Sequence, residues 1–134
     1  MLRTSMTLLG VASLSLATAA QGHHSTAEFD YSQVVVLEGT IKEVQWTNPH
    51  SYVQAMVPQP DGTVVQWGIE IGAPAINVAM GWRKTSVKPG DKVTLEISPA
   101  RNGRPYGTLR HLTFADGRKL DGVAARIPRT GIGN

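Results

Sequence analysis

The chain is organised around the stretch Val34–Val57, which reads VVVLEGTIKEVQWTNPHSYVQAMV. Its apolar residues alternate on odd positions up to Ile41 and then lie on even positions at Val44 and Trp46. A two-residue period that slips by one position predicts a β-bulge near Lys42-Glu43. The stretch therefore predicts one long strand with a bend in its middle, followed by a loop and a second strand, which is what a small barrel requires.

The chain that follows supplies further strands separated by turns. Asp61-Gly62 and Asn102-Gly103 are turn pairs that favour hairpins. Apolar alternation predicts strands over Val53–Val57, Val65–Ile71, Val93–Ile97 and Thr108–Phe114, with a short helix over Ala75–Met80. This order, β-β-β-α-β-β, predicts an all-β class with a small helical component, as a five-stranded, partly open OB-like barrel. A β-sandwich is the alternative, but it needs about seven strands.

The beginning of the chain predicts export. Met1–Ala19 has a positive charge at Arg3, an apolar run over Leu8–Ala17 and a small-residue cleavage pattern at its end, which together are typical of a secretory signal. A second small-residue pattern leaves the cleavage position open as far as Gly22. The apolar run is too short for a bilayer about 30 Å thick. We therefore expect a periplasmic or secreted protein that is not inserted in a membrane after signal cleavage.

The rest of the chain divides into three parts. Residues 20–33 form a polar lead-in segment with a histidine pair, residues 34–120 the barrel, and residues 121–134 a flexible tail without periodicity. The formal net charge of +3 is spread over the 134 residues, whereas nucleic-acid-binding proteins usually cluster their basic side chains. Cysteine is absent, which excludes disulfides and thiolate chemistry. We expect no nucleic-acid partner.

Several short motifs along the chain resemble those of a family of uncharacterised exported bacterial proteins with a domain of unknown function. The matching residues are His23-His24-Ser25, Phe29-Asp30, Gly39-Thr40-Ile41, Trp46–His50, Trp67 with Glu70, Gly81-Trp82, Lys88–Asp91 and Ala115-Asp116-Gly117. The resemblance covers about His23 to Leu120, and it implies export and an OB-like barrel. It implies no established activity.

The best candidates for ligand binding lie in and after the first loop. Trp46, Asn48, His50 and Tyr52 place aromatic and polar groups within seven residues. In OB-folds the loop between the first two strands flanks the ligand face. The alternative is an ordinary turn set by Asn48-Pro49, since proline restricts the backbone on both sides. Secondary candidates are Trp67, Glu70, Trp82, Arg101, Arg104, Tyr106 and Arg110. Of these, Trp67 alternates with core residues and is expected in the core, and Trp82 is expected to cap the end of the barrel.

Three histidines suggest a metal site. Cleavage after Gly22 would make His23 the first residue, whose amino group and imidazole can chelate copper together, with His24 or His50 as a third nitrogen donor. Such donors suit Cu(II). The arrangement resembles the histidine brace of periplasmic copper carriers and of copper polysaccharide monooxygenases. Cleavage after Ala19 would leave His23 internal and exclude the brace.

No pattern of residues indicates an enzyme. The carboxylates are not paired by spacing for acid–base work, and nucleophile elbows, phosphate loops and zinc-protease motifs are absent from the sequence. The sequence therefore predicts an exported, non-catalytic β-barrel binding module for an unknown ligand or partner protein. The alternative is a copper carrier or redox protein that uses His23, His24 and His50.

Overall fold

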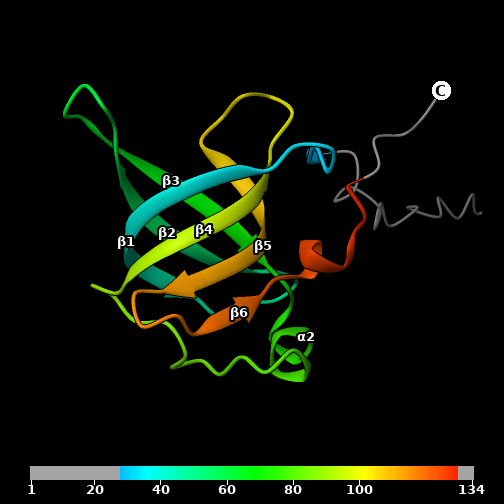
Figure 1. The fold of residues 1–134 in the computed structure, drawn as a ribbon. Coiled ribbons are helices and arrows are strands. Elements are labelled where there is room, and N and C mark those ends of the chain that lie inside the picture. Colours follow the sequence, from blue (N-terminus) through cyan, green and yellow to red (C-terminus); the bar gives the residue numbers. More distant parts are fainter. Residues whose placement is uncertain (1–27, 130–134) are drawn as a thin grey trace, which may run out of the picture.

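A closed β-barrel makes up most of the domain (Figure 1). The structure, a computed structural model, describes residues 28–129. Its elements are β1 (Val35–Gln45), β2 (Ser51–Pro58), β3 (Val64–Ile71), α2 (Pro74–Ala79), β4 (Lys92–Pro99), β5 (Tyr106–Phe114), β6 (Lys119–Asp121) and the 3₁₀-helix η1 (Val123–Arg126).

The strand order confirms the predicted OB-like barrel. The strands lie in the order β3-β2-β1-β4-β5-β6, and β3 also pairs in parallel with β5. This last pairing closes β1 to β5 into a barrel and leaves β6 outside it, beside β5. The sixth strand was missed because it has only three residues, of which only Leu120 is apolar.

The bend predicted in the first strand is present. The pairing of β1 with β2 shifts register between Ile41 and Glu43, as the parity change in the sequence predicted. The bend allows β1 to pair with β4 through its first half and with β2 through its second half. The inward-facing side chains of the barrel strands form one core.

The helix begins and ends near the predicted positions and buries a polar side chain. Ile76 is 50% exposed, whereas Asn77 is buried and donates from Nδ2 to the Gly72 carbonyl oxygen at 2.6 Å. Trp82, which follows the helix, is 2% exposed and closes this end of the barrel, where its Nε1 donates to the Asp121 carbonyl oxygen at 2.8 Å. The helix is therefore attached to the barrel both by the Asn77 hydrogen bond and by Met80, which packs against the core.

Both ends of the described chain pack onto the barrel. Phe29, in the predicted lead-in segment, is fully buried and forms a β-bridge with Ala100. At the other end, β6 finishes at Asp121 and η1 follows, with Ala124 fully buried. The first residues of the tail predicted from position 121 are thus part of the folded domain.

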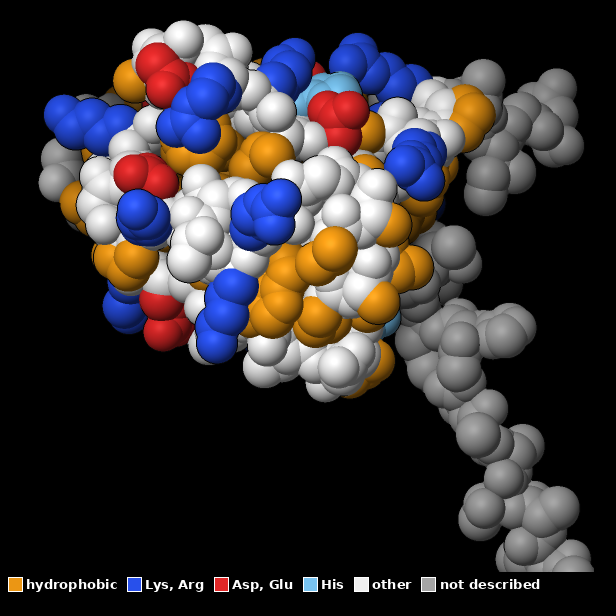
Figure 2. Space-filling view, turned by 90° about the horizontal axis from the view of Figure 1, so that it is seen from below, with side chains coloured by type: hydrophobic (Ala, Val, Ile, Leu, Met, Phe, Trp, Pro, Cys, Tyr) orange, Lys and Arg blue, Asp and Glu red, His pale blue; other side chains and the backbone are white. Residues whose placement is uncertain are grey.

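The outer surface carries mixed charges. Figure 2 shows Lys and Arg side chains dispersed among acidic and apolar ones on one face. Among residues 28–129, the exposed large apolar residues are Val36, Val64, Ile76 and Val78. Within residues 28–129, no helix is long and apolar enough to cross a bilayer.

Candidate functional site

The unusual feature of the barrel is a buried carboxylate on its outer face. Glu70 alternates with the inward-facing Ile69 and Ile71, so its side chain points away from the core, yet only 6% of the residue is exposed. None of the ion pairs among the described residues joins Glu70 to a Lys or Arg. Burying a carboxylate costs several kcal/mol unless its oxygens are well bonded. Such a group is more common at a functional site than in an ordinary β-surface.

Two side chains from separate parts of the chain hold the Glu70 carboxylate. His50 contacts Oε1 through Nδ1, and the Tyr106 hydroxyl donates to Oε2 at 2.8 Å. His50 precedes β2, Glu70 lies near the end of β3, and Tyr106 begins β5. These positions meet because β2 and β3 pair antiparallel and β3 and β5 pair parallel, with Glu70 opposite Tyr52. Both carboxylate oxygens are thereby satisfied. We call His50, Glu70 and Tyr106 the Glu70 cluster.

Aromatic rings surround this carboxylate. The Tyr106 ring centroid lies 5.5 Å from that of Phe29 and 6.4 Å from that of Tyr52. Burial, followed by the hydrogen bond to Glu70, raises the pKa of Tyr106 far above its ordinary value. Burial, and then the charge of Glu70, also raises the pKa of Tyr31. Both phenols are therefore protonated at neutral pH, and Tyr106 is a permanent hydrogen-bond donor to Glu70.

Local hydrogen bonds fix the loop that presents His50. The Thr47 hydroxyl donates to the His50 carbonyl oxygen at 2.8 Å. Ser51, fully buried, accepts from the Thr47 amide at 3.2 Å and donates from its hydroxyl to the Thr47 carbonyl oxygen at 3.1 Å. The Asn48–Pro49 peptide bond is cis. The loop thus fixes the backbone of His50, and Glu70 contacts its imidazole. The His50 side chain remains 36% exposed.

The structure separates the four predicted ligand-binding residues. His50 and Tyr52 lie together beside Glu70 and Tyr106. Trp46 is half-buried and packs against the core, while Asn48 is exposed in the loop. Among the secondary candidates, Trp67 is half-buried against the core and Arg101 and Arg104 are exposed in the β4–β5 loop.

Sequence reasoning gave too little weight to two residues of this cluster. Glu70 and Tyr106 are separated by 36 positions, and no spacing motif in the sequence connects them. One signal was present, namely a glutamate between two isoleucines at the end of a strand. Only the parallel β3–β5 pairing shows that a tyrosine covers it.

The predicted metal ligands are only partly visible. His23 and His24 lie outside the described residues. Within residues 28–129, no group of three or more His, Asp or Glu side chains is arranged to hold a metal ion. His50 has a single carboxylate partner, as does His111, whose Nδ1 lies 2.8 Å from Asp121 Oδ1.

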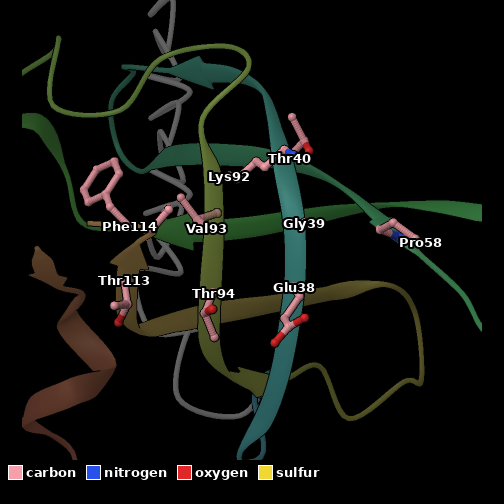
Figure 3. A pocket seen from close by; sticks show the side chains of 10 residues that line it. Glu38, Gly39, Thr40, Pro58, Lys92, Val93, Thr94, Thr113 and Phe114 are labelled. Atoms are coloured by element: carbon pink, nitrogen blue, oxygen red, sulfur yellow. The ribbon is translucent and has the colours of Figure 1, made fainter. Parts of the chain in front are cut away.

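An open groove of about 360 Å³ lies at the opposite ends of β2 and β5 from the Glu70 cluster. Figure 3 shows Glu38, Thr94 and Thr113 along it, from three neighbouring strands. Its two charged side chains, Glu38 and Lys92, form no ion pair among those of the described residues. The lining of the groove includes neither histidine nor tyrosine, so it offers fewer kinds of ligand-binding group than the Glu70 cluster.

Comparison with known families identifies the domain. Residues 11–110 match the model of a family of unknown function, DUF6152. The chain belongs to this family. The DUF6152 match includes His50, Glu70 and Tyr106, and it confirms the resemblance to an uncharacterised family that the motifs indicated. No curated protein and no solved structure matches the chain.

Proposed function

We propose that this DUF6152 protein is an exported, non-catalytic binding module whose ligand contacts the outer face of β2 and β3. The observation that carries the proposal is the buried Glu70 carboxylate, held by His50 and Tyr106. Its position between the first loop and the β4–β5 loop matches the ligand face of OB-folds. His50 is fixed by Glu70 but partly exposed, so it can meet a ligand without rearrangement, which reduces the entropic cost of binding.

The binding face can be tested by NMR. A metabolite library is screened against the ¹⁵N-labelled mature protein. We expect the small molecules that bind to shift the NMR signals of His50, Tyr52 and Tyr106. His50→Ala removes one hydrogen-bonding group, so affinity should fall about tenfold. His111→Ala is the matched control, because His111 also pairs with a carboxylate but lies on β5 beside β6. Shifts confined to other strands would contradict the proposal.

Copper binding is the second candidate, and the carboxylate–histidine pair favours it. Metal-ligating histidines usually bond their second ring nitrogen to a carboxylate, which orients the ring. Because Glu70 contacts Nδ1 of His50, Nε2 is the nitrogen left for a metal. Phe29 packs against Tyr106 beside this pair. The five residue steps from His24 to Phe29 in the sequence can, when fully extended, span a distance of roughly 17 Å. The predicted brace of His23, His24 and His50 is therefore within chain reach.

The copper proposal requires the natural N-terminus. We expect protein recovered from the exported fraction to begin at His23 and to bind one Cu(II) ion, measured by titration and by electron paramagnetic resonance. His50→Ala should weaken Cu(II) binding at least about tenfold and alter the spectrum, because one nitrogen donor is lost. His111→Ala should change neither property. A mature start at Ala20 or Gln21, or the absence of tight Cu(II) binding, would contradict a histidine brace.

A further inference from the structure

Beside the Glu70 cluster, a cleft of about 380 Å³ opens on the same outer face. Its lining comes from β3, the β4–β5 loop, the start of β5 and the segment before β1, and consists of Glu28, Gln66, Gly68, Arg104, Pro105 and Tyr106. We infer that this cleft binds an uncharged saccharide. The inference rests on the proposed function, since it names the ligand class for the same face.

Gly68, which lines the cleft beside Tyr106, has no side chain. A Cβ atom at Gly68 would lie 3.2 Å from Cδ2 of Tyr106 and 3.5 Å from Oε1 of Gln54. The Tyr106 ring can therefore lie directly against β3, where Gly68 pairs with it across the parallel ladder. An amphipathic aromatic ring beside bare backbone offers a surface for the C–H groups of a sugar ring.

The polar side chains of the cleft suit hydroxyl groups. Glu28 only accepts hydrogen bonds and Arg104 only donates them. The two do not pair with each other among the ion pairs of the described residues. A hydroxyl group donates to a carboxylate and accepts from a guanidinium equally well, so a polyhydroxylated ligand satisfies both. A phosphate would be repelled by Glu28, and an ammonium group by Arg104.

Gln66, the third polar side chain of the cleft, is already held in place by hydrogen bonds. Gln66 donates from Nε2 to Gln54 Oε1 at 3.3 Å and accepts from Lys42 Nζ at 2.8 Å. Its amide keeps one further donor and one further acceptor position, which again matches a hydroxyl. Side chains held in this way lose little rotamer entropy when a ligand binds.

A peptide ligand fits the cleft less well. Peptides that bind β-domains commonly add a strand to an open sheet edge. Here β3 is paired on both sides, with β2 and with β5, so neither edge of that strand is available beside Gly68. The lining also lacks an apolar pocket of the kind that anchors a peptide side chain.

Titration of the full mature protein with defined probes tests the inference. Cellohexaose, chitohexaose and maltohexaose are added separately to ¹⁵N-labelled protein, with tripolyphosphate and a neutral Gly-Ser hexapeptide as comparison ligands. We expect at least one hexasaccharide to shift the signals of Gln66, Gly68 and Tyr106. Gln66→Ala and Arg104→Ala should each weaken that binding about 5- to 10-fold, because each removes a hydrogen-bonding group.

The control is Arg118→Ala, which removes an exposed arginine outside the cleft and should leave saccharide affinity unchanged. The absence of binding to all three hexasaccharides, or binding of tripolyphosphate or the hexapeptide alone, would overturn the inference. Saccharide binding that shifts His50 and Tyr52 but is insensitive to Gln66→Ala and Arg104→Ala would overturn the cleft assignment and leave the proposed function standing. Both substitutions are at exposed positions, where stability changes are usually within about 0.5 kcal/mol.

Discussion

Arg110→Ala is expected to lower the free energy of unfolding by about 3–5 kcal/mol. The guanidinium is 3% exposed and makes hydrogen bonds in three directions. Its Nε donates to Ser98 Oγ at 2.8 Å, and its Nη2 to the Tyr31 carbonyl oxygen at 2.8 Å. Its Nη1 donates at 3.1 Å to the carbonyl oxygens of Ala124 and Ile127. Alanine would leave these acceptors without their donor.

Urea unfolding measures this loss, with Arg118→Ala as the matched control. The Arg118 side chain is 67% exposed, makes a surface ion pair with Asp116 and lies over the Phe114 ring, so we expect a loss of at most about 1 kcal/mol. Arg110→Lys should restore only part of the stability, because a single ammonium group cannot reach partners in three directions. Equal stability of Arg110→Ala and Arg118→Ala would show that the hydrogen bonds of Arg110 contribute nothing measurable.

Arg110 matters beyond stability because it joins both ends of the domain. Tyr31 belongs to the segment that carries Phe29 onto Tyr106, whereas Ala124 belongs to η1 and Ile127 directly follows it. A loss of Arg110 should therefore loosen the cover of the Glu70 cluster as well as η1. Protease cleavage near both segments under native conditions would reveal this loosening.

Trp82→Ala is the second substitution with a large expected effect, a loss of about 3–5 kcal/mol. The indole is almost completely buried at the end of the barrel and packs with the core. Removing it creates a cavity and also removes the hydrogen bond from Nε1 to the Asp121 carbonyl oxygen. The loss should be visible in thermal and urea unfolding.

Trp82→Phe separates the two contributions to this loss. It retains most of the ring volume and removes the hydrogen bond, so we expect a loss of about 1–2 kcal/mol. The same loss for Trp82→Phe and Trp82→Ala would indicate that the hydrogen bond to β6, rather than filling the barrel end, is the dominant contribution.

Arg110 and Glu70 represent two kinds of buried charged group in this barrel. Arg110 is satisfied mainly by carbonyl oxygens and fixes chain segments, which is a structural role. Glu70 is satisfied by a partly exposed histidine and a tyrosine on the outer face, and the proposed function rests on this arrangement.

Much of the fold could be predicted from local pattern. The parity slip before Val44 predicted the observed bulge, since strand side chains alternate strictly and one extra residue must reverse their faces. Trp82 was expected to cap the barrel, and it does. The role of Asn77 was not predictable, because helical periodicity does not identify an amide that bonds to the backbone of the preceding loop.

The class of fold, the bent first strand and the loop that carries His50 could be predicted from local sequence, because they depend on a residue period of two and on turn chemistry. The meeting of His50, Glu70 and Tyr106 in one cluster follows from the tertiary structure, because closure of the barrel by the parallel β3–β5 pairing is a contact between residues far apart in the chain. Strand alternation places Glu70 on the outer face. Its burial there results from the three-dimensional arrangement of a loop, a strand and the segment before β1.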